Sequence, residues 1–129
     1  FHHALQGFED FDLIARLKAQ GRFVMVEEPG MAYRMHGKGF TRTGGIHVIR
    51  SRETFLRRMQ TLCRGQRSKQ AIVKHMLADC YSDWGMHDVR IGNRQEARAK
   101  LLQSIRCNPF KFRTYTRLLR AILPSSRLV

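Results

Sequence analysis

The sequence has few cysteines, few acidic residues and no long apolar run. Its 129 residues include three cysteines, an odd number without a Cys-x-x-Cys pair. Neither a disulfide framework nor a zinc site is therefore indicated, and a reducing, cytoplasmic environment is expected. No apolar stretch approaches the roughly 20 residues that a membrane-spanning helix needs. Hydrophobic residues nevertheless make up 43% of the chain, which is too many for a disordered protein, so the chain is expected to fold.

The sequence also lacks an initiating Met and an N-terminal targeting segment, since it opens with Phe1-His2-His3. We therefore expect it to be a piece of a longer protein. No Walker-type phosphate loop, helix-turn-helix signature or RNA-binding signature is visible.

The shortage of acidic residues is confined to one part of the chain. The 10 acidic and 24 basic residues give a net charge of +14. Residues 1–44 hold six basic and five acidic residues, whereas residues 45–129 hold 18 basic and five acidic, a net charge of +13. This shift predicts two functional regions with a boundary near residue 44.

The first region reads as a mixture of helix and strand. A helix is predicted over residues 8–20, because apolar residues recur there at three- and four-residue spacings and Gly21 follows as a stop. Two short extended runs, residues 22–26 and 31–36, flank a turn at residues 27–30. The predicted fold class is thus mixed α/β at the N-terminal end, with a helix and a short β-hairpin, followed by a mainly helical region of about four helices.

Residues 37–45 contain four glycines together with Lys38 and Arg42. Two interpretations remain open for this segment. It is either a mobile linker or a loop that brings backbone N–H groups and cations to an anion.

Four helical segments are predicted beyond residue 45. The first carries an apolar stripe from Ile46 to Cys63. The second covers residues 68–91 with Ile72, Met76 and Cys80 at four-residue spacing. The third covers residues 94–107, and the fourth covers residues 111–123 with apolar residues on one side. The apolar residues of that last side are Tyr115, Leu118, Leu119 and Ile122.

One stretch in this basic region resembles a single tetratricopeptide unit. The matching positions are Tyr81, Trp84, Gly85, Ala97, Leu101, Ser104 and Pro109. Asp88 departs from the pattern, where an aromatic residue is expected, and Trp84 and Ser104 are substitutions at their positions. Because a free-standing array needs about three units, we interpret the match as a local helical hairpin packed on a neighbour.

Three residues of the first region suggest chemistry. Glu9 and Asp10 lie at the start of a helix beside Phe8 and Phe11, where one carboxylate could act as a general base or both could simply cap the helix. His36, at the end of an extended run, could be a metal ligand or an ordinary surface histidine.

The order of these pieces resembles the C-terminal part of a family 2 glycosyltransferase. The resemblance covers about residues 4–44, through the run GFEDFDLIARL at residues 7–17, then Gly21-Arg22-Phe23, Glu28-Pro29 and Tyr33-Arg34-Met35-His36-Gly37. Residues 45–124 are similar to the helical tail of many bacterial members. The implied organisation is a C-terminal segment of the catalytic domain at residues 1–44 and a basic helical tail at residues 45–129.

The resemblance implies a GT-A fold, a nucleotide-diphosphate sugar as donor, and a glycan or lipid-linked acceptor. It implies Asp10 as the base that deprotonates the acceptor hydroxyl, with Glu9 orienting the acceptor. His36, Lys38 and Arg42 are implied to contact the donor diphosphate. A divalent metal, Mg²⁺ or Mn²⁺, is implied for the full-length enzyme, held partly by an Asp-x-Asp motif in a preceding half and, at His36, by this segment. No metal is expected to bind this segment alone, which is expected to be inactive by itself.

Asp12 and Arg16 match the family pattern as well. Because they lie four residues apart on one predicted helix, they are expected to pair with each other.

The charge of the helical tail leaves a second class of function open, a basic binding module. Its partner could be an anionic membrane surface, which would hold the protein at the inner face of the membrane, or another protein. Nucleic acid is the least favoured partner, because Phe110, Phe112 and Tyr115 are expected to lie in the core and not to stack on bases. Exposed apolar helix faces would also permit self-association.

Overall fold

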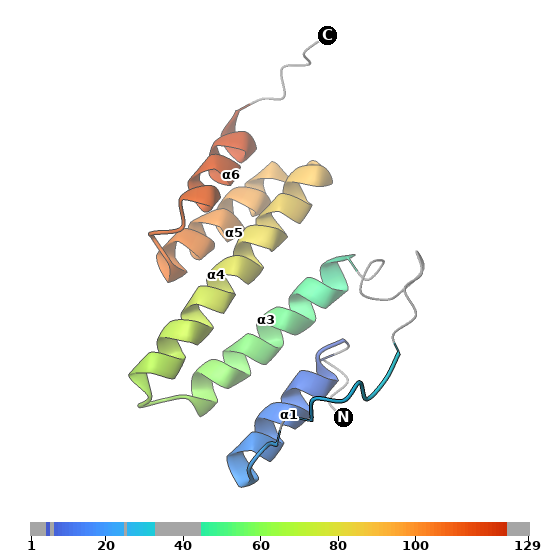
Figure 1. Cartoon of the computed structure of the whole chain (residues 1–129). Coiled ribbons are helices and arrows are strands. Elements are labelled where there is room, and N and C mark those ends of the chain that lie inside the picture. The colour runs from blue at the N-terminus through green and yellow to red at the C-terminus, as the bar shows by residue number, and fades with distance from the viewer. Residues whose placement is uncertain (1–4, 6, 25, 33–44, 124–129) are drawn as a thin grey trace.

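The computed structural model describes residues 5, 7–24, 26–32 and 45–123 (Figure 1). The helices in this part are α1 (Glu9–Gln20), α3 (Gly45–Leu62), α4 (Arg67–Arg90), α5 (Arg94–Cys107) and α6 (Phe112–Ile122). The helix predicted at residues 8–20 and the four helices predicted beyond residue 45 are therefore confirmed, with boundaries within about three residues.

The predicted β-hairpin is wrong. The described residues between Gly21 and Ala32 contain no strand, so the fold class is helical and not mixed α/β at its N-terminal end. Val24 is 86% exposed and Val26 is 72% exposed. Apolar β-branched residues favour strands only when a neighbouring strand and a packed surface are present, and an isolated two-stranded hairpin is marginal in water. Most of the second predicted strand, residues 33–36, lies outside the described residues.

The helices pack in chain order, and α4 is central. It lies between α3 on one side and α5 on the other, while α6 packs on α5 and also contacts α4 (Figure 1). The turn between α4 and α5 uses Gly92 at φ +83°, a backbone conformation that favours glycine, and the Asn93 side chain caps α5 by accepting the Glu96 N–H at 3.5 Å. The predicted break at Gly92-Asn93 is therefore confirmed.

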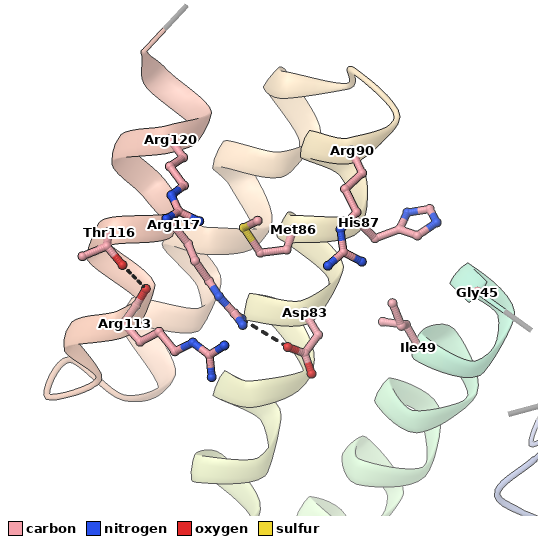
Figure 2. A pocket seen from close by; sticks show the side chains of 10 residues that line it. All are labelled: Gly45, Ile49, Asp83, Met86, His87, Arg90, Arg113, Thr116, Arg117 and Arg120. Atoms are coloured by element: carbon pink, nitrogen blue, oxygen red, sulfur yellow. Dashed lines mark hydrogen bonds and ion pairs between the residues drawn. The ribbon is translucent and has the colours of Figure 1, made fainter. Parts of the chain in front are cut away.

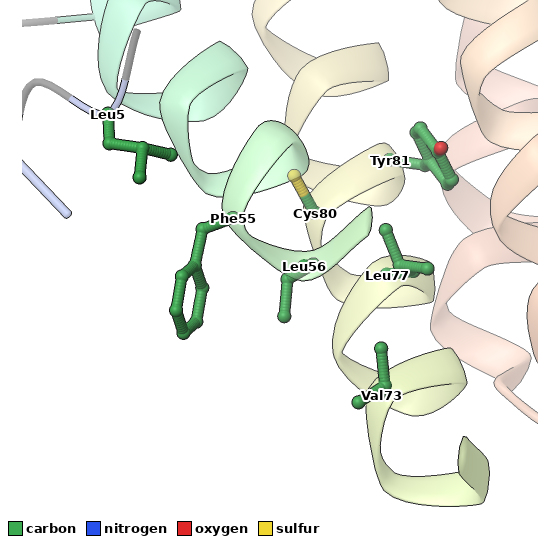
Figure 3. Close-up of a cluster of buried hydrophobic side chains, with 7 residues drawn as sticks. All are labelled: Leu5, Phe55, Leu56, Val73, Leu77, Cys80 and Tyr81. Carbon is green, nitrogen blue, oxygen red and sulfur yellow. The ribbon is translucent and has the colours of Figure 1, made fainter. Parts of the chain in front are cut away.

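The main core lies between α3 and α4, with one residue from the segment before α1 (Figure 3). Its buried members are Leu5, Phe55, Leu56, Val73, Leu77, Cys80 and Tyr81. The stripe predicted on α4 is therefore only partly right, because Cys80 is buried whereas Ile72 is 61% exposed and Met76 is 39% exposed. A helix that packs on both sides buries several faces, so a single stripe does not describe it.

A second core joins α5 to α6 through Ala97, Leu101 and Ala121. Ser104 donates a hydrogen bond to the Ala78 carbonyl at 2.6 Å, and its hydroxyl lies 3.3 Å from that of Thr114. These contacts confirm the helical hairpin predicted from the tetratricopeptide-like spacing, together with its packing on a neighbour.

The apolar side predicted for α6 faces this core only in part, because Leu118 packs against it whereas the other members do not. Tyr115, Leu119 and Ile122 are 39%, 56% and 49% exposed, and Phe110 and Phe112 are 82% and 79% exposed. The expectation that the aromatic residues of this segment are core residues is therefore wrong. The helix packs through the small side chains of Thr114 and Ala121, which let it approach α5 closely.

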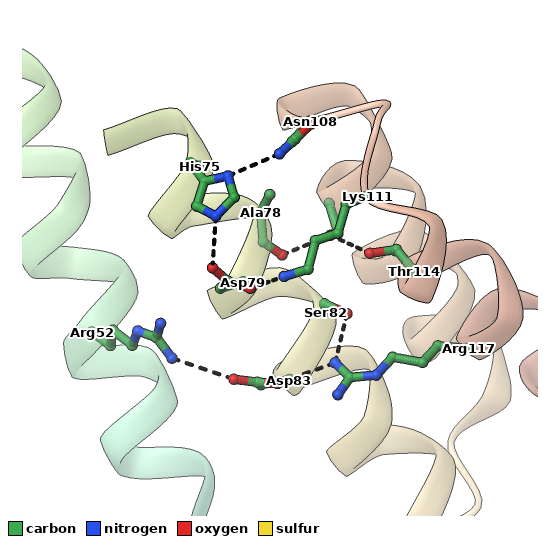
Figure 4. Close-up of polar contacts among 11 residues, drawn as sticks. Arg52, His75, Ala78, Asp79, Ser82, Asp83, Asn108, Lys111, Thr114 and Arg117 are labelled. Atoms are coloured by element: carbon green, nitrogen blue, oxygen red, sulfur yellow. Dashed lines mark hydrogen bonds and ion pairs between the residues drawn. The ribbon is translucent and has the colours of Figure 1, made fainter. Parts of the chain in front are cut away.

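Polar contacts from α4 fix the positions of its neighbours (Figure 4). Asp83 pairs with Arg52 of α3 at 3.3 Å and with Arg117 of α6 at 3.1 Å. Asp79 pairs with Lys111, just before α6. Burial, followed by the nearby Arg117, Arg113 and Arg52, lowers the pKa of Lys111.

Candidate functional site

The start of α1 carries the carboxylates that the sequence singled out. Helix α1 follows a turn in which the Phe8 N–H donates to the Leu5 carbonyl at 2.6 Å. Glu9, Asp10 and Asp12 fall in its first turn, where carboxylates are stabilised by the positive end of the helix dipole. The helix lies beside α3 in Figure 1, and the ring of Phe55 there packs against Phe8 at 5.9 Å between centroids.

Asp10 is exposed. One of its oxygens, Oδ1, accepts the N–H of the next residue, Phe11, at 2.9 Å. This hydrogen bond orients the carboxylate, and the second oxygen has no partner among the described residues. Asp10 can therefore accept a proton from a molecule that approaches α1 from solvent.

Glu9 is half-buried, and its Oε2 is buried without a hydrogen-bond partner within the described part of the chain. An unpaired buried carboxylate oxygen is costly, and this one is not accessible to a molecule that approaches from solvent.

Asp12 is buried and has a structural role. Its carboxylate pairs with Arg16 Nε at 3.1 Å and with Arg58 Nη1 of α3 at 3.4 Å. The predicted pair with Arg16 is confirmed. The contact with Arg58 was not predicted, because no sequence pattern indicates which residue of a distant helix lies opposite α1.

The tripeptide Asp10-Phe11-Asp12 also matches the Asp-x-Asp pattern. The family resemblance implies a motif of this pattern in the half of the enzyme that precedes this segment. Residues two apart on a helix do not face the same side. Asp10 is accordingly exposed while Asp12 is held by two arginines, so the two carboxylates do not form a metal-binding pair here.

The remaining site residues, His36, Lys38 and Arg42, lie outside the described residues, so the structure does not place them relative to Asp10. Within the described residues, no group of three or more His, Cys, Asp or Glu side chains could hold a metal ion. The described residues therefore do not by themselves supply a ligand set for the implied Mg²⁺ or Mn²⁺.

The three cysteines are unpaired. Burial raises the pKa of the Cys80 thiol to about 11, and the Sγ of this residue lies 3.5 Å from the Ile49 carbonyl. The thiol is therefore protonated at neutral pH and is a core side chain, not a nucleophile.

A second site was not predicted from the sequence. It is a pocket of about 530 Å³ between the start of α3, the second half of α4 and α6 (Figure 2). Arginines dominate its lining, namely Arg90, Arg113, Arg117 and Arg120. The spacing of the last three, i, i+4 and i+7, signals a common helix face, but the sequence does not show which element that face meets.

None of the described helices combines the length and the apolar character needed to cross a membrane. Comparisons of this chain with protein-family models, curated proteins and solved structures found no match.

Proposed function

We propose that this chain is the acceptor-side, C-terminal part of a sugar-nucleotide-dependent, inverting glycosyltransferase, with Asp10 as its catalytic base. The observation that carries the proposal is the contrast between two neighbouring carboxylates. Asp10 is exposed and has a free oxygen, whereas Asp12 is buried and held by two arginines. A general base must reach the proton that it abstracts, so of these two only Asp10 is suited to the role.

The proposed reaction needs one proton acceptor on the acceptor side. Asp10 takes the proton of an acceptor hydroxyl while that oxygen attacks the anomeric carbon of the donor sugar from the face opposite the diphosphate. The bond from the anomeric carbon to the diphosphate oxygen breaks, and the nucleoside diphosphate leaves with the electron pair. The products are the glycoside, with inverted configuration, and the nucleoside diphosphate.

Glu9 is proposed to position the acceptor. Glu9 is only half-buried, and we propose from the family resemblance that its carboxylate accepts a hydrogen bond from a second hydroxyl of a glycan or lipid-linked acceptor. Such a bond would hold the reacting hydroxyl beside Asp10, one residue away on the same helix turn.

The residues proposed to contact the donor lie outside the described part of the chain. We propose from the family resemblance that His36, Lys38 and Arg42 contact the departing diphosphate, where positive charge stabilises the leaving group. We also propose a cytoplasmic enzyme, peripheral at the inner face of the membrane if its acceptor is lipid-linked. The unpaired cysteines are consistent with a reducing compartment.

A donor screen tests this function. The full-length protein is incubated with a panel of nucleotide-diphosphate sugars in buffer with Mg²⁺ or Mn²⁺, with and without oligosaccharide and lipid-linked acceptors, and nucleoside diphosphate release is followed. We expect release from at least one donor, and we expect it to depend on an acceptor. Release that ignores the acceptor, or no release from any donor, would contradict the proposal.

A further inference from the structure

The arginine pocket between α3, α4 and α6 has more positive charge than its surroundings neutralise. Among the described residues that line it, Arg90, Arg113, Arg117 and Arg120 are basic and Asp83 is the single acid, so the lining carries a net charge of +3 with His87 neutral. Figure 2 shows these side chains reaching into the pocket from α4 and from α6.

Asp83, the single acid, does not neutralise the other three arginines of the pocket. Asp83 already pairs with Arg52 at 3.3 Å and with Arg117 at 3.1 Å. Arg90, Arg113 and Arg120 have no carboxylate partner within the part of the chain that the structure describes. Like charges held close together repel, so an anion that enters this pocket would relieve the repulsion.

Part of the pocket is held in place before any ligand binds. The Arg117 side chain is only 15% exposed, and its Nη1 donates to Ser82 Oγ at 2.7 Å as well as to Asp83. Arg113 and Arg120 lie four residues before and three residues after Arg117, so the three share one face of α6. A preorganised cation with two more cations on the same face favours binding, because less side-chain freedom is lost.

The start of α3 adds to the positive potential. Gly45 and Ile49, in the first turns of this 18-residue helix, line the pocket, and α3 has no acidic residue in its first turn. The unpaired N–H groups and the helix dipole at such an end attract anions. The N-terminal end of α3 and the arginines are therefore both electropositive, and both line the same pocket.

We propose that this pocket binds a ligand that carries at least two phosphate groups. Arginine recognises phosphate through paired hydrogen bonds, and arginines on two helices can engage more oxygens than one phosphate offers. A volume of about 530 Å³ lies within the usual range for small-molecule sites, about 300–1,000 Å³. Few apolar side chains line it, mainly Ile49 and Met86, so a polar ligand is favoured.

Two kinds of ligand carry at least two phosphate groups and could fill the pocket. One is a soluble diphosphate, and the other is a phosphorylated lipid headgroup. The proposed pocket is independent of sugar transfer, because none of the residues that line it belongs to the site on α1.

Isothermal titration calorimetry with inorganic pyrophosphate tests the pocket. Arg113 and Arg120 are exposed and pair with no other described side chain, so the double variant Arg113→Gln/Arg120→Gln should fold normally. We expect it to bind pyrophosphate roughly tenfold more weakly than the unmodified protein, because it loses two charge-assisted contacts.

The matched control is Arg64→Gln/Arg106→Gln, which removes the same charge from exposed positions outside the pocket. We expect this control to change the affinity less than about twofold at physiological salt, where distant surface charges are screened. Equal affinity losses in the two double variants, or no loss in either, would overturn the site.

Vesicle co-sedimentation distinguishes the two sources. Phosphatidylcholine vesicles with and without a few mole per cent of a bisphosphorylated inositol lipid are compared. A lipid source predicts that binding needs the phosphorylated lipid and that Arg113→Gln/Arg120→Gln weakens it, while Arg64→Gln/Arg106→Gln does not. Vesicle binding that is the same for every variant overturns the lipid source, and selective pyrophosphate binding then supports the soluble one.

Discussion

Gly85 lies where α4 and α5 approach each other closely. A Cβ atom built at this position would lie 2.6 Å from Leu101 Cγ and 3.0 Å from the Ala97 carbonyl oxygen. Leu101 is fully buried, so its side chain has no free space into which it could move. The absence of a side chain at residue 85 therefore sets the distance between α4 and α5.

We expect Gly85→Ala to destabilise the protein. Overpacking of a buried contact costs about 1–3 kcal/mol, which exceeds the gain of about 1 kcal/mol that alanine brings to a helix interior. A net loss of up to about 2 kcal/mol would lower Tm by up to several degrees, which a thermal melt followed by circular dichroism measures.

The control for this substitution is Gly30→Ala. A Cβ atom at residue 30 would meet nothing within 4 Å, so this variant should melt close to the unmodified protein. A Gly85→Ala variant as stable as Gly30→Ala would show that the α4–α5 contact is looser than described.

The sequence predicted some of these single residues and not others. The tetratricopeptide-like spacing picked out Gly85, Ala97 and Leu101, because close contacts within a hairpin impose local spacings. It did not predict Arg58 opposite Asp12, since contacts between elements far apart in the chain depend on how those elements dock. Asp10 could be proposed as a base from the sequence, but its exposure and the burial of Asp12 became visible only in the structure.

Among the helices, α1 has the weakest attachment. The rings of Phe8 and Phe11 lie 5.9 Å and 6.3 Å from Phe55 of α3, Ala15 packs against the main core, and Asp12 pairs with Arg58. Phe11 and Ile14 are still 53% and 50% exposed. We therefore infer that the ion pair, in which Asp12 is buried and Arg58 is 41% exposed, is one determinant of where α1, and with it Asp10, is held.

We expect Asp12→Asn to loosen α1. The substitution removes the negative charge opposite Arg58, whose Nη1 lies 3.4 Å from Asp12 without forming a hydrogen bond, and the loss of such a partly exposed ion pair costs up to about 1 kcal/mol. Hydrogen exchange measured by mass spectrometry should show faster exchange in α1, with no change in α4 and α5.

The comparison for this experiment is Arg16→Gln. Arg16 shares the same carboxylate, but its side chain is 53% exposed, and an exposed i, i+4 pair contributes only about 0.3–0.5 kcal/mol. Exchange in α1 should therefore stay near that of the unmodified protein. Equal acceleration in the two variants would contradict the role assigned to the α1–α3 pair.

Helix α6 shows why the sequence predicted this element but not its orientation. Its strong periodicity fixed its bounds, yet the helix packs on α5 through Thr114 and Ala121 and leaves Leu119 and Ile122 half-exposed. Hydropathy favours large apolar residues as the buried face, whereas close helix packing can favour small ones. The β-hairpin prediction failed for a related reason, because strand propensity in residues 22–26 needs a partner strand to take effect.

In the described part of the chain, the proposed transfer site and the arginine pocket lie on different helices. The carboxylates proposed for sugar transfer lie on α1, at one side of the helical layer, whereas the unpaired arginines gather where α3, α4 and α6 meet (Figure 1, Figure 2). The net charge of +13 in residues 45–129 is therefore not part of the proposed transfer site. We propose that this charge serves binding and that Asp10 serves catalysis.

The most direct measurement is the turnover of the Asp10→Asn variant of the full-length enzyme, with its best donor and acceptor. General base catalysis typically contributes about 10²–10⁴-fold, so we expect transfer to fall at least about 100-fold. Donor affinity should stay within about twofold, because the change leaves size and shape intact. Glu27→Gln, which neutralises an exposed carboxylate outside α1, should retain full activity. Undiminished turnover in Asp10→Asn would contradict the assignment of Asp10 as the base.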